Sequence, residues 1–485
     1  MSTGRIGALP AAAVRVVAGH RLFAALLVTA TALRVVVQIA YRPALFFYGD
    51  SFAYLENTAR LRPEPIRPFG YPLLLRAVLV IHDLAAVPAV QHVLGLATGV
   101  VVYALVRRLG VGAIGGSVAA APVLFDAYQL NIEQHILSEA LFSLLVAAGL
   151  CVLLWRARPS VAACVAAGVL LAAAALTRSV GLPLIAPALV FAIVRGGPVR
   201  TLALAAAFAL PLVGYAAWYS TAPEGSFTLT NHDGYFLYGR VADFASCRGM
   251  PLGAAERRVL CDPRPPADRP SPNYYVWHQW SGRSYPGFPG KASRRNALLQ
   301  SFAIGVIHRQ PLAYARTVLG DMEHYAAFGR STGPLDEPVK QWQFRVPRGQ
   351  TRRALARIEF EVRTWGGAVG GWRPGQRALA AYQRVAYTPG PLLLAALVLA
   401  LAGAAAGTAP GLARRLRAET LTLAAAGLLL PLVAAMTSMF DYRYLLPALP
   451  LLPAAGVLGA AVLTARLRAL RPAGADPVGI PSRGR

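Results

Sequence analysis

The chain has 485 residues, of which 56% are hydrophobic and only 14% are charged, and its mean hydropathy is +0.47. A soluble globular protein carries roughly 25% charged residues, so this composition excludes a chain that is soluble as a whole. The net charge of +26 does not indicate a nucleic-acid partner, because the basic residues are dispersed between apolar stretches rather than gathered on one domain.

Apolar stretches follow one another along the chain, and most approach the length that crosses a bilayer core of roughly 30 Å. They are residues 20–40, 72–106, 112–126, 136–155, 161–177, 180–194, 201–220, 390–408, 419–437 and 445–465. His82, Asp83 and Pro88 interrupt the second stretch and indicate a short interfacial helix followed by a membrane helix near 87–106. The sequence therefore predicts a polytopic α-helical membrane protein with about ten transmembrane helices.

Arginines in short loops predict the orientation, because such loops are enriched in Lys and Arg on the cytoplasmic side. They precede the first apolar stretch, follow alternate stretches, and follow the last one: Arg5, Arg15, Arg21, Arg107, Arg108, Arg156, Arg158, Arg195, Arg200, Arg414, Arg415, Arg417, Arg466, Arg468 and Arg471. Both termini are therefore predicted to be cytoplasmic. The excess of Arg over Lys and the abundance of Ala suggest a bacterial cell (inner) membrane.

This orientation divides the chain into four predicted parts. Residues 1–220 form an N-terminal membrane module with about seven helices, residues 221–388 an extracytoplasmic domain of mixed secondary structure, residues 389–465 three C-terminal membrane helices, and residues 466–485 a cytoplasmic tail. Cys247 and Cys261 lie in the outer domain, where an oxidising compartment favours a disulfide. Two free thiols are the alternative.

The first outer loop places Asp50 a few residues beyond the first apolar stretch. In one interpretation Asp50 is a catalytic carboxylate in a cavity at the membrane surface, where partial desolvation raises its basicity. In the other, Asp50 or Ser51 is the N-cap of an amphipathic helix.

Four further polar residues fall on the same predicted side. Glu139 begins an apolar helix and is expected to face a polar cavity or a partner, whereas Glu133 either faces that cavity or is an acid favoured by a helix macrodipole. Arg178 and Arg443 either bind a phosphate through the planar guanidinium or lie at the lipid headgroups, and Arg443 has a possible partner in Asp441. Because they share one side, we expect these residues to line one cavity with Asp50.

Motifs of other enzyme classes are missing from the sequence. It contains no Walker loop, no zincin helix and no dinucleotide-binding fingerprint that opens a soluble βαβ unit. His232 and Asp233 lack the partner spacing of a metal site.

Four short motifs occur in order on the predicted outer side. They are Gly-Asp-Ser at 49–51 with Arg-Pro-Phe-Gly-Tyr-Pro at 67–72, Leu-Ser-Glu-Ala-Leu at 137–141, Leu-Thr-Arg at 176–178, and Asp-Tyr-Arg-Tyr at 441–444. With this arrangement the chain resembles the GT-C superfamily of integral membrane glycosyltransferases. It is most similar to the branch that uses polyprenyl-phosphate sugars, which includes protein mannosyltransferases and the lipid A aminoarabinose transferase. The resemblance covers residues 1–220 best.

The resemblance implies a role for each residue of the predicted cavity. Asp50 would be the general base that deprotonates an acceptor hydroxyl, the anomeric configuration would invert, and polyprenyl phosphate would leave. Arg178 and Arg443 would stabilise the charge on that phosphate, and Glu133 or Glu139 would orient the acceptor or the sugar. Because Asp50 has no neighbouring acid in an Asp-x-Asp pair, no metal and no other cofactor is expected.

The predicted function is transfer of a hexose or pentose from a polyprenyl-phosphate-linked donor to a glycan, lipid or protein acceptor in cell-envelope assembly. A transporter or flippase of a lipid-linked glycan is the main alternative, although transporters often show repeated halves and the halves of this sequence are dissimilar. A non-catalytic scaffold whose outer domain binds cell-wall partners is the third.

Overall fold

The computed structural model describes residues 19–47, 49–277, 291–345, 352–406 and 412–469. Tyr48, the arginines at 5, 15 and 471, and residues 470–485 of the predicted tail lie outside these ranges. The described residues are helical and contain no β-strand, apart from an isolated parallel bridge between Leu45 and His135. The prediction of a mixed outer domain is therefore wrong for its described part, because its Pro- and Gly-rich segments separate short helices rather than strands.

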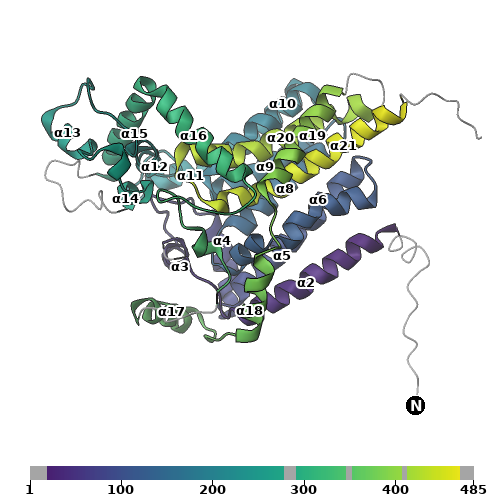
Figure 1. The fold of residues 1–485 in the computed structure, drawn as a ribbon, viewed down its shortest axis with the longest axis horizontal. Coiled ribbons are helices and arrows are strands. Elements are labelled where there is room, and N and C mark those ends of the chain that lie inside the picture. The colour runs from purple at the N-terminus through teal and green to yellow at the C-terminus, as the bar shows by residue number, and fades with distance from the viewer. Residues whose placement is uncertain (1–18, 48, 278–290, 346–351, 407–411, 470–485) are drawn as a thin grey trace, which may run out of the picture.

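Apolar helices pack together and make up the larger part of the molecule (Figure 1). Their bounds are α2 Arg21–Ala40, α4 Gly70–Val78, α5 Ala86–Arg108, α6 Ala113–Phe125, α8 Glu139–Leu154, α9 Val161–Thr177, α10 Ile185–Arg195, α11 Pro198–Ser220, α19 Gly390–Ala406, α20 Leu412–Thr437 and α21 Leu452–Ala469. Five helices of the described residues, α2, α5, α11, α20 and α21, are long and apolar enough to cross a membrane. The others are shorter, so a multi-pass protein is shown but the count of ten stays a prediction.

Small residues let some of these helices approach closely, as is usual in membrane proteins. Helix α21 packs against α19 and α20, and α9 packs against α8 and α11. At the α19–α21 contact, a Cβ added to Gly403 would lie 2.5 Å from the Cα of Gly459. No larger side chain fits there without moving one helix away from the other.

The helices within residues 233–309 gather at one end of the molecule, whereas those within residues 352–383 lie apart from them (Figure 1). The remaining helices complete the described chain. They are α3 Asp50–Arg60, α7 Ala127–Gln134, α12 Asp233–Ala242, α13 Ala254–Leu260, α14 Pro272–Trp277, α15 Ala292–Arg309, α16 Pro311–Ala326, α17 Arg352–Trp365 and α18 Arg373–Gln383. Short 3₁₀ helices complete the fold: η1 Leu79–Ile81, η2 Ser179–Leu184, η3 Pro266–Asp268, η4 Val339–Trp342 and η5 Tyr442–Ala448.

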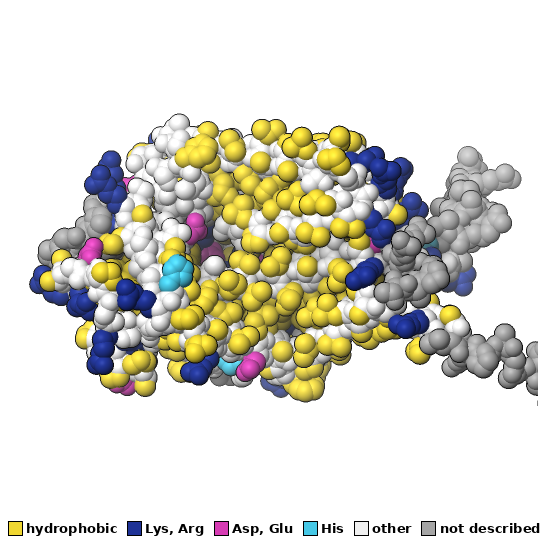
Figure 2. Space-filling model, turned by 90° about the horizontal axis from the view of Figure 1, so that it is seen from above, with side chains coloured by type: hydrophobic (Ala, Val, Ile, Leu, Met, Phe, Trp, Pro, Cys, Tyr) yellow, Lys and Arg dark blue, Asp and Glu magenta, His cyan; other side chains and the backbone are white. Residues whose placement is uncertain are grey.

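The surface has the composition expected at a bilayer. Hydrophobic side chains cover the middle of the face drawn in Figure 2, and Lys and Arg gather toward its two ends. Large apolar side chains such as Val28, Ile114, Leu202 and Leu392 are exposed. Their exposure to water would be costly, whereas lipid solvates them.

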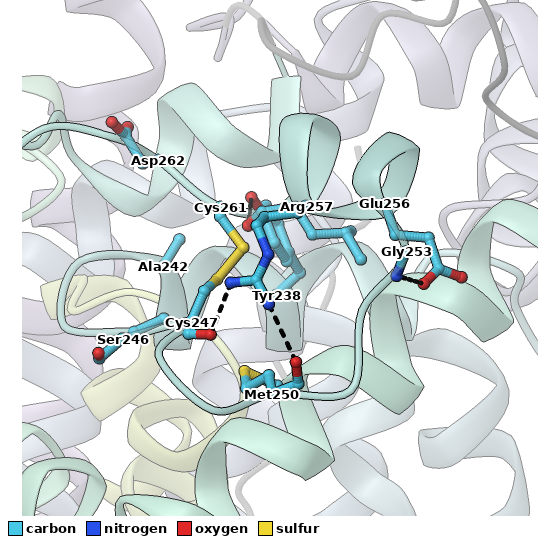
Figure 3. The surroundings of a disulfide bond; sticks show 12 residues. Tyr238, Ala242, Ser246, Cys247, Met250, Gly253, Glu256, Arg257, Cys261 and Asp262 are labelled. Atoms are coloured by element: carbon cyan, nitrogen blue, oxygen red, sulfur yellow. Dashed lines mark hydrogen bonds between the residues drawn. A yellow bond between two sulfur atoms is a disulfide. The ribbon is translucent and has the colours of Figure 1, made fainter.

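A disulfide joins Cys247 to Cys261 in the outer domain (Figure 3). Arg257, which lies on α13, donates hydrogen bonds to the carbonyl oxygens of Cys247 at 2.8 Å and Met250 at 3.0 Å. The loop between the two cysteines is thus held by a covalent bond and by a guanidinium. Cys151 and Cys164 are free and buried.

We expect the double change Cys247→Ser and Cys261→Ser to destabilise the outer domain by about 2–4 kcal/mol, because the bond closes a short loop and restricts the unfolded chain. Thermal unfolding of the purified protein measures the loss. As a control, the denatured wild-type chain should show two alkylatable thiols before reduction and four afterwards. Four thiols before reduction would contradict the bond.

Candidate functional site

Two outer loops are joined by backbone hydrogen bonds. The N–H of Leu45 donates to the carbonyl of Gln134 at 2.9 Å, and the N–H of Ile136 donates to the carbonyl of Leu45 at 3.1 Å. These bonds fix the chain before α3 beside the chain before α8. The first residues of those helices, Asp50 and Glu139, are therefore brought to the same region.

Asp50 lies between two guanidinium groups. Its Oδ2 accepts a hydrogen bond from Arg443 Nη1 at 2.6 Å, and its Oδ1 accepts one from Arg67 Nη2. Gly49 occupies the N-cap position of α3, and no side chain caps that helix end. The N-cap interpretation of Asp50 is therefore wrong, because both of its carboxylate oxygens face arginines.

The two arginines determine the charge of Asp50. The side chain is buried, with 8% of the residue exposed. Burial by itself raises the pKa of a carboxyl group, but here Arg67 and Arg443 outweigh it and hold the pKa of Asp50 well below its usual range. Asp50 is thus ionised at neutral pH, and the expectation that desolvation raises its basicity is wrong, because the two arginines outweigh burial.

Arg178 and Glu139 form a second ion pair in the same region. Arg178 Nη1 lies 2.5 Å from Glu139 Oε1 and 3.2 Å from Ser138 Oγ. The Ser138 hydroxyl also lies 3.1 Å from the hydroxyl of Tyr54 on α3. Arg178 therefore pairs with a buried carboxylate.

Arg443 connects the two ion pairs. Besides Asp50, its guanidinium lies 3.8 Å from Glu139 Oε1 and 3.1 Å from Asp441 Oδ2. Asp441 accepts hydrogen bonds from the Arg443 N–H at 2.9 Å and from Trp342 Nε1 at 2.7 Å. Burial raises the pKa of Asp441 to about 7 although Arg443 opposes the shift. Asp50, Glu139, Arg178 and Arg443 thus meet in one cluster, as predicted from their shared side.

Glu133 lies elsewhere. It is fully buried at the end of α7, where Arg34 on α2 binds it through two hydrogen bonds of 2.8 and 2.9 Å, and His92 on α5 approaches to 2.9 Å. A Cβ added to Gly95 would lie 2.0 Å from Glu133 Oε1, so α5 leaves space for the carboxylate. The helix-start role of Glu133 is wrong, because the residue lies at the end of α7. Its substrate-orienting role stays a prediction. Arg34, a cation within the first span, was the overlooked signal.

The Glu133 cluster supports the neighbouring loop. Gln91 donates hydrogen bonds to the carbonyls of Glu133 at 2.8 Å and His135 at 2.6 Å, and accepts one from the hydroxyl of Tyr71 at 2.6 Å. These contacts fix the chain three residues before Ser138. The cluster therefore positions the segment that carries Glu139.

We expect Glu133→Gln to destabilise the protein by about 3–5 kcal/mol, because it leaves the Arg34 guanidinium buried without a carboxylate. Thermal unfolding in one detergent measures the change. The paired variant Arg34→Met with Glu133→Met removes both charges and should recover part of the loss. A Glu133→Gln protein as stable as wild type would contradict the role of this ion pair.

Arg67 was missed as a site residue, although it opens the Arg-Pro-Phe-Gly-Tyr-Pro motif. It lies over the Tyr54 ring at 5.5 Å and binds Glu64 Oε1 at 3.0 Å in addition to Asp50. Trp342 was also missed, because its place beside Asp441 depends on the fold of the outer domain. Within the described ranges, no three His, Cys, Asp or Glu side chains are grouped as a metal would require; independence from metals stays a prediction.

The described residues also form an apolar groove. It has a volume of about 290 Å³ and is lined by Leu61, Phe69, Gly70, Leu73, Leu176, Tyr215 and Trp218. Phe69 follows Arg67 by two residues, and Leu176 precedes Arg178 by two. Two residues that line the groove are thus close in the chain to two of the site arginines.

Fold and site together define a helical multi-pass membrane protein that has an apolar groove and whose outer loops assemble carboxylates and guanidiniums. Residues 82–196 match the family model of the dolichyl-phosphate-mannose-protein mannosyltransferases, a domain of the GT-C superfamily. The resemblance to this superfamily is therefore confirmed over a segment that contains Glu139 and Arg178. Comparison with curated proteins and with solved structures finds no match.

Proposed function

We propose that this protein transfers a sugar from a polyprenyl-phosphate-linked donor to an acceptor hydroxyl, with Asp50 as the general base. One observation carries the proposal: an ionised, buried carboxylate lies among guanidiniums that distant parts of the chain contribute. The match over residues 82–196 to a family whose description names a lipid-phosphate mannose donor supports this chemistry. The acceptor is a glycan, lipid or protein hydroxyl.

In the proposed reaction a carboxylate oxygen of Asp50 takes the proton of the acceptor hydroxyl. The acceptor oxygen then forms a bond to the anomeric carbon on the face opposite the phosphate. The bond between that carbon and the phosphate oxygen breaks, and its electron pair leaves with the polyprenyl phosphate. Attack from the opposite face inverts the configuration. A positioned base of this kind contributes typically 10²–10⁴-fold to a rate.

Arg178 and Arg443 are suited to the charge that develops on the leaving phosphate. Both side chains are mostly buried, with 15% and 10% exposed, and a guanidinium in a water-poor site stabilises such charge more strongly than in water. Glu139 holds Arg178 and lies near Arg443. It therefore orients the arginines, and through them the donor.

The apolar groove supports a lipid-linked donor. A soluble nucleotide sugar has no use for a hydrophobic surface, whereas an isoprenoid chain gains about 0.8 kcal/mol for each buried CH₂ group. Because Phe69 and Leu176 line the groove and are close in the chain to Arg67 and Arg178, a phosphate bound at the arginines places its lipid chain at the groove. We assign the first isoprene units of the donor to this surface.

The cellular setting completes the proposal. The arginine distribution supports a bacterial inner membrane with both termini in the cytoplasm and residues 221–388 outside, as the disulfide in that region also does. The same proposal includes the four-part division of the chain. It also includes a role in cell-envelope assembly and transfer without a metal.

We expect Asp50→Asn to lower sugar transfer by at least about 100-fold, because the amide cannot accept the acceptor proton. The assay supplies labelled polyprenyl-phosphate mannose to membranes that contain the protein and measures sugar transferred to endogenous acceptors. Asp268→Asn is the matched control, since it removes one negative charge from an exposed position of the outer domain. Transfer that survives in Asp50→Asn would remove Asp50 as the base.

Filling the groove tests the lipid assignment. Leu73→Trp should raise KM for a long-chain donor several-fold and affect a donor with a single isoprene unit much less, because only the long chain needs the covered surface. Leu392→Trp is the control, since Leu392 is exposed to a similar extent, 61% against 57% for Leu73, but lies on α19. Equal effects of Leu73→Trp on both donors would contradict the assignment.

A further inference from the structure

Every guanidinium group of the site already holds a carboxylate. Arg67 binds Asp50 and Glu64, Arg178 binds Glu139, and Arg443 binds Asp50 and Asp441. A phosphate that enters this cluster therefore competes with these carboxylates for the guanidinium groups. The question is which carboxylate leaves.

We propose that Asp50 occupies the guanidinium contacts of Arg67 and Arg443 that the donor phosphate takes when it binds, so that donor binding releases the base. This inference rests on the proposed function, and it deepens it in two ways. It assigns Arg67 to the phosphate-binding site. It also links the two events, because Asp50 becomes available as a base only when the phosphate takes its contacts.

The geometry favours Asp50 as the group that is displaced. Its two oxygens are shared between two arginines that approach from different parts of the chain, on α20–η5 and on the first outer loop. A phosphate presents several oxygens in the same forked arrangement and satisfies two guanidiniums at once. Glu139, in contrast, holds mainly Arg178, and Asp441 holds only Arg443.

The arginines keep their positions when Asp50 leaves. Arg443 retains Asp441, which is itself fixed by the indole N–H of Trp342 at 2.7 Å. Arg67 retains Glu64 at 3.0 Å. The exchange therefore needs a rotation of the Asp50 side chain and no movement of the helices.

The exchange also has a chemical consequence. While both oxygens of Asp50 accept from guanidiniums, the carboxylate is a weak base. When the phosphate takes over those contacts, the positive charge around Asp50 is neutralised and the burial of the side chain favours proton uptake. Asp50 thus gains basicity only when a donor is present, and its return to the arginines after transfer helps to expel the phosphate product.

Binding of farnesyl phosphate to the full-length protein in detergent tests the exchange. This probe carries the phosphate and three isoprene units but no sugar. We expect Asp50→Asn to bind it about tenfold more tightly than wild type, because the competing carboxylate is gone, although the same variant loses transfer. Farnesol, which lacks the phosphate, should bind both proteins equally. Asp268→Asn again controls for net charge.

A second variant covers the case in which Asp50→Asn does not fold. Glu64→Gln removes the other competitor of Arg67 at a less buried position and should also tighten farnesyl phosphate binding, by a smaller factor. Arg67→Gln should weaken it. Equal or weaker binding in a folded Asp50→Asn protein, or no effect of Arg67→Gln, overturns the exchange.

The outcome separates this inference from the proposed function. Loss of transfer in Asp50→Asn with unchanged affinity for farnesyl phosphate leaves the base in place and removes only the exchange. Tighter phosphate binding in Asp50→Asn with undiminished sugar transfer would keep the competition but remove the catalytic role of Asp50.

Discussion

The contact of Asp50 with Arg67 and Arg443 is the interaction on which the rest of the site depends. The two arginines are separated from Asp50 by 17 and 393 positions in the chain, so this contact joins the N-terminal membrane module to the C-terminal one. Charges buried this deeply are stable only when they are paired. Because neither partner is tolerated alone, the pairing of these charges and the packing of the two modules depend on each other.

A second group of buried polar residues lies in the same bundle and has a structural role. Arg34, Glu133 and His92 are linked to one another and are buried. Arg34 also donates to the carbonyl of Leu124 at 2.9 Å, at the end of α6. This group fixes the turn between α6, α7 and α8, and so sets where Glu139 begins its helix. The cluster around Asp50 thus carries the proposed chemistry, and the cluster around Glu133 positions the helix that begins at Glu139.

The outer domain is tied to both clusters. The N–H of Glu337 donates to the carbonyl of Phe440 at 3.0 Å, next to Asp441. Arg330 lies 3.9 Å from the ring centre of Tyr128 and 3.3 Å from Asp126, which also caps α7. The segment that contains Glu337 and Trp342 therefore lies against the site, where it helps to exclude water from the arginines. Exclusion of water strengthens each of their electrostatic interactions.

The sequence by itself determined the class of the protein and the places of its apolar helices, because hydropathy and the motifs are local properties. The membrane side of its polar residues stays a prediction. The break between α15 and α16 is also local, since Pro311 begins one helix readily but would interrupt a longer one. Only the tertiary structure decided how the charges pair. Glu133 and Glu139 are six residues apart and look equivalent in the sequence, yet one faces Arg34 and the other Arg178. Arg67 looked like part of a loop motif until the fold placed it on Asp50. Pairing depends on contacts between residues far apart in the chain, and a pattern of neighbouring residues carries no information about them.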